Sequence, residues 1–143
     1  MKPFNIRVYA FLEHEDKVLV IHEPFQGKLI YKFPGGGLEF GEGTRECLQR
    51  EFREELNVEV EILDHLYTQD FFMQSAFDAQ EQIVLIYYTA RIPTAELAKL
   101  RVLDSDIEAF IWTKVADLDA NNFTLAADKI AIERYKEQKT PNH

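Results

Sequence analysis

The sequence predicts an α+β fold, in which helices and strands are mixed within one domain spanning residues 1–143. Two observations predict it. Several segments are rich in Ile, Val, Tyr and Phe, which favour strands, and two others carry apolar residues at helical spacing. A chain of 143 residues with 46% hydrophobic residues is long enough to enclose one core. Because the sequence shows no repeat, low-complexity tract or linker, no domain boundary is expected.

The strand-forming segments lie on both sides of a glycine-rich stretch. Residues 6–11 and 17–21 are expected to be strands joined by a turn at Glu15 and Asp16. Residues 29–33 lead into the glycine-rich stretch. Further extended segments are expected at 58–72, 82–91 and 107–113, followed by a turn of helix at 114–118.

Helical spacing marks residues 45–58 and 126–138. In the first helix, Leu48, Phe52 and Leu56 recur every fourth residue and form the stripe that should face the core. The apolar positions of the second helix are Ala126, Ala127, Ile130 and Ala131.

Three carboxylates of the first helix, Glu51, Glu54 and Glu55, share an arc of about 100° at the edge of this stripe. Like charges at such spacing destabilise a helix by about 0.2–0.5 kcal/mol per pair. A hard divalent cation would reverse that effect, because it takes carboxylate oxygens as ligands. The alternative is a solvated face with the ion pairs Glu46–Arg50 and Arg50–Glu54. The charge pattern alone leaves both interpretations open.

Five of the six glycines lie between Gly35 and Gly43, immediately before this helix. Glycine adopts backbone angles closed to other residues, so the stretch suits tight turns and close backbone approach. A glycine loop followed by clustered carboxylates indicates a site for a divalent metal and a phosphate.

The spacing of these residues resembles the Nudix box. That pattern is Gly, five residues, Glu, seven residues, then Arg-Glu-U-x-Glu-Glu-x-Gly-U, where U is a bulky apolar residue. Here it runs from Gly36 through Glu42 and Arg50 to Val58, with every charged position matched. The one clear departure is Asn57, where the family has glycine. This position ends the helix, and asparagine is the usual second choice for a left-handed residue there.

The resemblance implies a Nudix-type α/β/α sandwich around a mixed, curled β-sheet. It also implies a metal-dependent pyrophosphohydrolase that cleaves a nucleoside diphosphate linked to another group and releases a mononucleotide. Two to three Mg²⁺ or Mn²⁺ ions would be held by Glu51, Glu54, Glu55 and the Gly35 carbonyl. Arg50 would orient these carboxylates without touching the metal. Gly36, Gly37 and Glu42 would form the substrate loop.

The general base is left open by the resemblance. Some family members use a glutamate of the helix, which here is Glu54. Others use an acid from a loop before a late strand, where this chain has Asp104, Asp106 and Glu108. Asp106 and Glu108 are the loop candidates, although exposed loop acids are commonly only solvated.

The substrate class follows from markers that the sequence lacks. The ADP-ribose branch of the family usually carries a proline after the box, but no proline lies between residues 58 and 92. The proline- and tryptophan-rich array of the NADH branch is also missing. A nucleoside triphosphate or a nucleotide sugar remains. A nucleotide-sensing domain that does not hydrolyse its ligand is the alternative. Residues that could bind a terminal phosphate are Arg7, Lys28 and Lys32, and rings that could stack on a base are Phe25, Tyr31, Phe71, Phe72, Phe77, Tyr87 and Tyr88.

Charge and composition limit the partners. Sixteen basic and twenty-five acidic side chains give a net charge of −9, which disfavours a nucleic-acid polymer. No apolar run of membrane-spanning length or secretory pattern is present, so no membrane partner and a cytoplasmic location are expected. The single cysteine, Cys47, suits a reducing compartment. A homodimer is compatible with the sequence.

Overall fold

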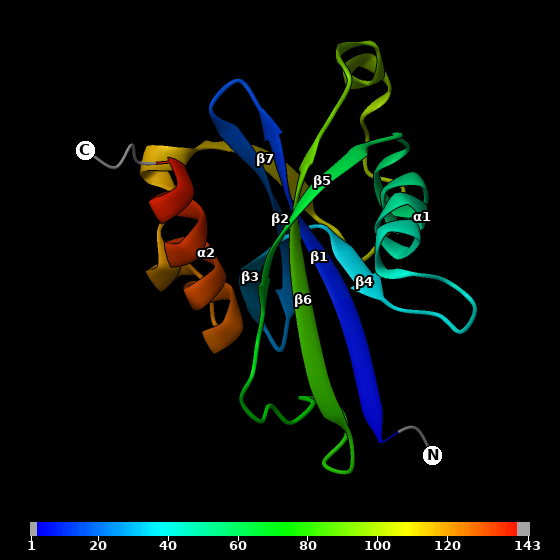
Figure 1. Cartoon of the computed structure of the whole chain (residues 1–143), viewed down its shortest axis with the longest axis vertical. Coiled ribbons are helices and arrows are strands. Elements are labelled where there is room, and N and C mark those ends of the chain that lie inside the picture. The colour runs from blue at the N-terminus through cyan, green and yellow to red at the C-terminus, as the bar shows by residue number, and fades with distance from the viewer. Residues whose placement is uncertain (1–2, 140–143) are drawn as a thin grey trace.

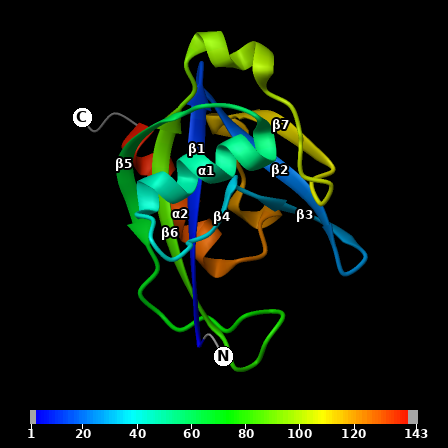
Figure 2. The same cartoon turned by 90° about the vertical axis from the view of Figure 1, so that its right-hand side faces the viewer.

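The computed structural model describes residues 3–139 as one β-sheet between two helices (Figure 1). Helix α1 (Thr44–Leu56) covers one face of the sheet, and helix α2 (Ala126–Lys139) covers the other. Turned by 90°, the molecule shows α1 lying across the sheet in front of β1 (Figure 2). The three layers confirm the predicted α/β/α sandwich.

The sheet is mixed, as predicted, and has seven strands among the residues described. Its main path runs β3-β2-β1-β6-β5, with β4 on β1 and β7 on β2. The strands are β1 (Phe4–His14), β2 (Lys17–Phe25), β3 (Lys28–Lys32), β4 (Gly35–Gly37), β5 (Glu61–Thr68), β6 (Gln82–Arg91) and β7 (Ala109–Lys114).

Strand β1 is the centre of the sheet. It pairs in parallel with β6 along its whole length, from Phe4 opposite Gln82 to Glu13 opposite Arg91. Its pairing with β2 is antiparallel and includes Glu13 with Val18 and His14 with Lys17, next to the turn at Glu15 and Asp16. Both turn residues have a positive φ, 48° and 62°, so the turn expected from the sequence is a left-handed one. Nearer the start of β1, residues 7–9 of the same edge pair with the glycine strand β4.

Two separate cores hold the helices on the sheet. The stripe Leu48, Phe52 and Leu56 of α1 is fully buried against the sheet, together with Leu19 and Ile21 of β2. On the opposite face, α2 packs through Ala127, Ala131, Ile132 and Tyr135 against Phe11, Phe33 and Tyr87.

Some elements differ from the sequence expectations. The glycine stretch expected as a loop contains strand β4, because glycine backbones pair with β1 without any side-chain pattern to announce it. A 3-10 helix at Thr94–Lys99 was not expected. The extended segment 58–72 forms a strand only at 61–68, and the strand expected at 107–113 runs from Ala109 to Lys114.

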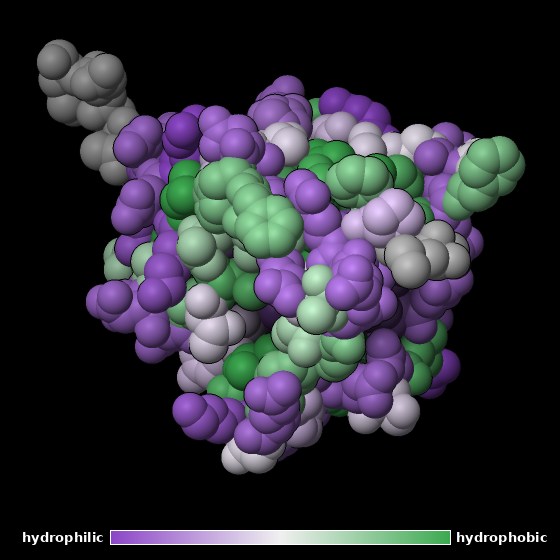
Figure 3. All heavy atoms as spheres, turned by 90° about the horizontal axis from the view of Figure 1, so that it is seen from below, coloured by the Kyte–Doolittle hydropathy of each residue, from purple (hydrophilic) through white to green (hydrophobic). Residues whose placement is uncertain are grey.

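The surface mixes polar and apolar side chains. Viewed from below, apolar patches alternate with hydrophilic ones (Figure 3). Phe40 is fully exposed in the loop before α1, and Phe72 and Phe77 are exposed in the loop between β5 and β6. Within residues 3–139, no helix is long and apolar enough to cross a membrane.

Candidate active site

Helix α1 carries the candidate acids and begins directly after the glycine loop. The Glu46 carboxylate accepts a hydrogen bond from the Gly43 backbone N–H (2.9 Å), which satisfies a free donor at the helix start. The helix ends at Asn57, whose φ of 64° is left-handed. The Asn57 side-chain amide also donates to the Lys99 carbonyl (3.0 Å). Asparagine therefore replaces the glycine of the motif in the same backbone conformation and adds a tertiary contact.

Arg50 joins the loop to the helix. Its Nε and Nη2 donate to both carboxylate oxygens of Glu42, at 2.9 and 2.6 Å. Nη1 donates to Glu51 (2.8 Å) and Glu54 (3.2 Å), and Nη2 also reaches the Gly37 carbonyl (3.0 Å). The hydrogen bonds from Arg50 lower the pKa of Glu42 to about 2. This geometry places Arg50 where it can orient the helix carboxylates.

The glycines of β4 let the loop backbone approach both β1 and α1. A Cβ at Gly36 would lie 2.6 Å from the Glu51 carboxylate, and one at Gly35 would lie 2.0 Å from the Val8 carbonyl oxygen. Gly35 also has a φ of 145°. At Gly37 a Cβ would meet only ordinary contacts, the nearest being Arg7 Nη1 at 3.7 Å. Two of the three glycines are thus fixed by contact with their neighbours.

The three acids of α1 differ in environment. The Glu54 side chain is 59% exposed, whereas that of Glu51 is 14% exposed and Glu55 is 7% exposed. Burial raises the pKa of Glu51, although Arg50 opposes the shift. Burial also raises the pKa of Glu55 to about 8; Lys32 opposes this, and Glu51 and Asp104 add to it. The protein thus holds two carboxyl groups in positions that penalise their negative charge.

These acids fit a divalent cation. The buried Oε1 of Glu55 has no hydrogen-bond partner, and an orphaned buried carboxylate oxygen is costly unless a cation or donor meets it. In the part of the chain described here, however, no three acid, histidine or cysteine side chains already converge as a metal site. Glu51 and Glu54 instead each direct an oxygen to Arg50.

The loop acids before β7 lie in different places. Asp104 is half-buried, and its charge contributes to the raised pKa of Glu55. The chain next to it runs along the end of α1, where the Leu103 N–H donates to the Glu55 carbonyl (2.8 Å). Asp106 and Glu108 are exposed, and the charge of Glu108 acts on His22. Of the three, Asp104 is thus the acid whose charge acts on a helix carboxyl, that of Glu55.

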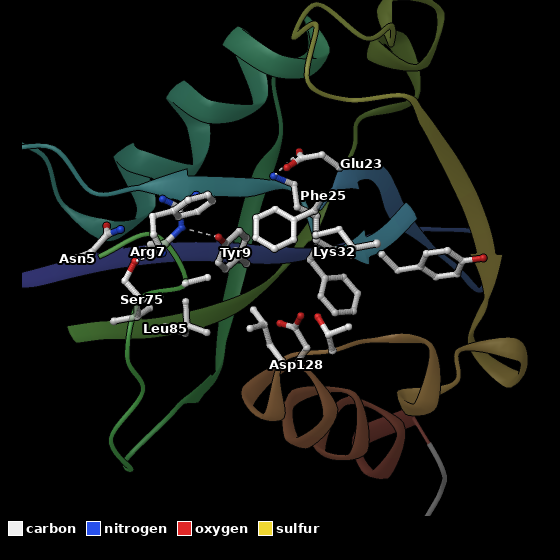
Figure 4. A pocket seen from close by; sticks show the side chains of 17 residues that line it. Asn5, Arg7, Tyr9, Glu23, Phe25, Lys32, Ser75, Leu85 and Asp128 are labelled. Carbon is white, nitrogen blue, oxygen red and sulfur yellow. Dashed lines mark hydrogen bonds and ion pairs between the residues drawn. The ribbon is translucent and has the colours of Figure 1, made fainter. Parts of the chain in front are cut away.

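A cavity of about 230 Å³ opens between the sheet and α2 (Figure 4). Of the candidate rings, Phe25, Tyr31 and Phe77 line it, and of the candidate phosphate-binding residues, Arg7 and Lys32 do. Lys28 lies at the exposed start of β3, outside this lining. Tyr87 is buried in the α2 core, and the lining does not include Phe71, Phe72 or Tyr88.

Arg7 and Lys32 connect the cavity to the acids of α1. Burial opposes a raised pKa of Arg7, but Tyr9 and, to a smaller extent, the charges of Glu51 and Glu55 raise it. Lys32 forms an ion pair with Glu23 (2.8 Å), and the charge of Glu55 also helps to raise the pKa of Lys32 against the effect of burial. Arg7 and Lys32 therefore line the cavity and also interact electrostatically with the acids of α1.

Asp128 of α2 and Tyr9 of β1 line the same cavity, and the sequence did not single them out. Asp128 is 4% exposed and accepts a hydrogen bond from the Tyr87 hydroxyl. Burial raises its pKa to about 6. A lone acid at the start of an amphipathic helix resembles an ordinary first-turn residue, so only the packing of α2 on the sheet identifies it.

Comparison with known proteins identifies the family. The sequence model of the protein family described as the NUDIX domain matches residues 3–134. The curated phosphatase NudJ of Escherichia coli K12 is 25% identical over 119 residues, which cover 82% of this chain and 74% of that protein.

Two solved structures have the same fold. The solution structure of the E. coli ORF135 protein superposes with a TM-score of 0.76 at 21% identity, covering 98% of this chain and 93% of that one. The MutT NUDIX hydrolase from Burkholderia pseudomallei gives 0.73 at 26% identity, covering 92% and 97%. Because the family model matches nearly the whole chain, this protein belongs to the Nudix family of hydrolases.

Proposed function

We propose that this chain is a divalent-metal-dependent pyrophosphohydrolase that cleaves a nucleoside diphosphate linked to another group and releases a mononucleotide. A nucleoside triphosphate or a nucleotide sugar is the proposed substrate. The observation that carries the proposal is the orphaned Oε1 of Glu55, within an acid cluster beside a cavity lined by Arg7 and Lys32. The names of related proteins support hydrolysis of phosphate compounds: one is a phosphatase, and a neighbour from Streptococcus suis is an ADP-ribose pyrophosphatase.

Glu51, Glu54 and Glu55, with the Gly35 carbonyl, would hold two to three Mg²⁺ or Mn²⁺ ions. Oxygen ligands of this kind suit both ions. When bound, such ions neutralise phosphate oxygens and lower the pKa of a coordinated water.

Side chains of the protein would have two roles: Arg50 would orient the acids, and one acid would accept a proton. Arg50 holds Glu51 and Glu54 through charged hydrogen bonds and ties them to the loop acid Glu42. Glu54 is the most exposed of the three helix acids, so it can reach a water molecule in the site and serve as the general base. Asp106 and Glu108 remain candidates for that role, and Asp104 joins them because of its electrostatic effect on Glu55.

The cavity would bind the group that carries the phosphates. Its lining is mostly aromatic and aliphatic, which suits a flat ring, and Phe25, Tyr31 and Phe77 offer stacking surfaces. Polar groups at its walls, Lys32 and Asp128, can pair with the edge of that ring.

A nucleotide panel tests the proposal. Purified protein is assayed with Mg²⁺ or Mn²⁺ against nucleoside triphosphates and nucleotide sugars, with Glu54→Gln and the exposed Glu59→Gln as a matched pair. We expect a mononucleotide product, full loss of turnover in EDTA, and a fall of at least about 100-fold for Glu54→Gln alone. Tight nucleotide binding without turnover of any compound would instead favour the sensor. A rate unchanged across an EDTA titration would exclude metal dependence.

A second series identifies the general base. Asp104→Asn, Asp106→Asn and Glu108→Gln are compared with Glu54→Gln in pH–rate profiles. The substitution that removes the acidic limb of the profile marks the base. If all four profiles keep that limb, none of these residues is the base.

A further inference from the structure

Arg7 is a cation held at the border between the cavity and the acid helix. It projects from β1 and lines the cavity, and its Nε donates a hydrogen bond to the Tyr9 hydroxyl at 2.6 Å. Its Nη1 lies 3.7 Å from where a Cβ of Gly37 would stand, at the edge of the glycine strand. Figure 4 shows Arg7 and Tyr9 side by side on the sheet, joined by this bond.

The two terminal nitrogens of Arg7 have no hydrogen-bond partner among residues 3–139, although its Cζ lies over the Tyr9 ring, 5.7 Å from the ring centre. Among residues 3–139, Arg7 forms no ion pair, and Nε is the only one of its nitrogens that donates a hydrogen bond. The neighbouring cations differ in this respect: Lys32 is paired with Glu23, and Arg50 is shared among Glu42, Glu51 and Glu54. Glu51 and Glu55 act on Arg7 only at longer range. Arg7 is therefore a fixed, partly buried cation whose two terminal nitrogens are free to bind an anion.

We propose that Arg7 binds the phosphate attached to the group in the cavity, which is the phosphate kept in the mononucleotide product, and that Tyr9 positions it. A guanidinium presents parallel donors that match two phosphate oxygens. Arg7 lines the cavity, and it is near enough to α1 for the charges of Glu51 and Glu55 to act on it, so a phosphate at the edge of the cavity would meet this fork. In a chain with a net charge of −9, such a cation also offsets repulsion of an anionic substrate. The inference rests on the proposed function.

The test separates phosphate binding from binding in the cavity. In EDTA, calorimetry measures the affinity of AMP, GMP, CMP and UMP and of the four matching nucleosides for the wild type, Arg7→Met, Arg7→Lys and Tyr9→Phe. Arg91→Met is the matched control, because Arg91 ends β6 and pairs with Glu61 on the surface. Circular dichroism verifies that each variant is folded.

We expect the wild type to bind at least one monophosphate more tightly than its nucleoside. Arg7→Met should lose about 10- to 100-fold in affinity for that monophosphate and none for the nucleoside. Arg7→Lys should recover part of the loss, Tyr9→Phe should lose less than Arg7→Met, and the control should match the wild type. Equal losses for nucleoside and monophosphate, no loss, or a wild type without preference for the monophosphate would each overturn the proposal.

The readout also distinguishes this inference from the proposed function. Absence of turnover for every nucleotide, together with Arg7-dependent monophosphate binding, would refute the hydrolase and leave the phosphate site standing. Metal-dependent turnover, with monophosphate binding indifferent to Arg7, would do the reverse. In an active enzyme, Arg7→Met should raise KM more than it lowers kcat, because the contact exists in both substrate and product.

Discussion

The Arg50 guanidinium grips Glu42 with two hydrogen bonds, from Nε to Oε2 at 2.9 Å and from Nη2 to Oε1 at 2.6 Å. The remaining donors of Arg50 reach Glu51, Glu54 and the Gly37 carbonyl. One side chain therefore fixes the loop to the helix and orients two of the three acids. Such bidentate geometry belongs to arginine and cannot be reproduced by the point charge of lysine.

Arg50→Lys should lower both stability and turnover. Loss of the paired hydrogen bonds to partly buried carboxylates should cost about 1–3 kcal/mol in the free energy of unfolding and at least 10-fold in kcat. Arg53→Lys on the same helix is the control: its pair with Glu59 is exposed and should contribute under about 1 kcal/mol. Urea denaturation and steady-state kinetics measure both quantities. Equal effects at the two arginines would show that the Glu42 contact has no special role.

Gly36→Ala should disturb the Glu51 carboxylate, because its Cβ would lie 2.6 Å from that group. We expect weaker Mn²⁺ binding by at least 10-fold, measured by calorimetry. Gly37→Ala is the natural comparison, since its Cβ meets no atom closer than 3.7 Å. Both glycines have φ values outside the positive range, so backbone strain does not separate them. Identical Mn²⁺ affinities in the two variants would contradict the steric argument.

Asn57→Ala should destabilise the protein more than Asn57→Gly. Alanine keeps the left-handed strain, about 1–2 kcal/mol, and loses the hydrogen bond to the Lys99 carbonyl. Glycine loses the same hydrogen bond but relieves the strain, so its net effect should be small. Chemical denaturation of the three proteins gives the ranking. The prediction is wrong if alanine is tolerated as well as glycine.

Asp128 should make stability depend on pH. Its pKa of about 6 lies above the ordinary value of 3.8, so folding favours the neutral carboxyl and stability falls as pH rises from about 4 to about 6. Asp128→Asn keeps an acceptor for the Tyr87 hydroxyl but cannot ionise. The variant should therefore gain about 1–3 kcal/mol relative to the wild type between pH 4 and pH 7. Denaturation curves at five pH values test this, and a constant difference would refute it.

Glu55 should reveal the metal without any turnover assay. In EDTA at pH 8, Glu55→Gln should raise the melting temperature, because it removes a buried charge whose Oε1 has no hydrogen-bond partner. Added Mn²⁺ should stabilise the wild type by mass action and the variant much less. Glu59→Gln, an exposed site, should respond to Mn²⁺ as the wild type does. A Glu55→Gln variant with the full Mn²⁺ response would remove Glu55 from the metal ligands.

Helix α1 could be predicted from the sequence because its signals are local. The apolar stripe, the glycine before it and Asn57 after it lie within one segment, and its bounds were right to within two residues at each end. The arc shared by the three acids follows from the helical period alone. What local spacing could not give is their difference in burial, because the exposure of Glu55 depends on the chain at 101–104 packing beside it.

The cavity could not be predicted, because no segment contains it. Arg7 and Tyr9 come from β1, Lys32 from β3 and Asp128 from α2, and only the sheet order brings them together. Arg7, Lys28 and Lys32 were equivalent as cations in the sequence. In the folded sheet they differ. Arg7 keeps its two terminal nitrogens without a hydrogen-bond partner among the residues described, Lys28 is exposed, and Lys32 is paired with Glu23.

The parallel pairing of β1 with β6 also determines when the fold can be completed. Strand β1 is synthesised before its partner β6, and residues 15–81 lie between the two strands. Until β6 is made, the edge of β1 that pairs with it has no hydrogen-bonding partner strand. The chain segment between the two strands forms a large loop that must close when they pair. Folding should therefore be governed by a late, long-range docking event, during which a nascent chain with an open β1 edge is most exposed to aggregation.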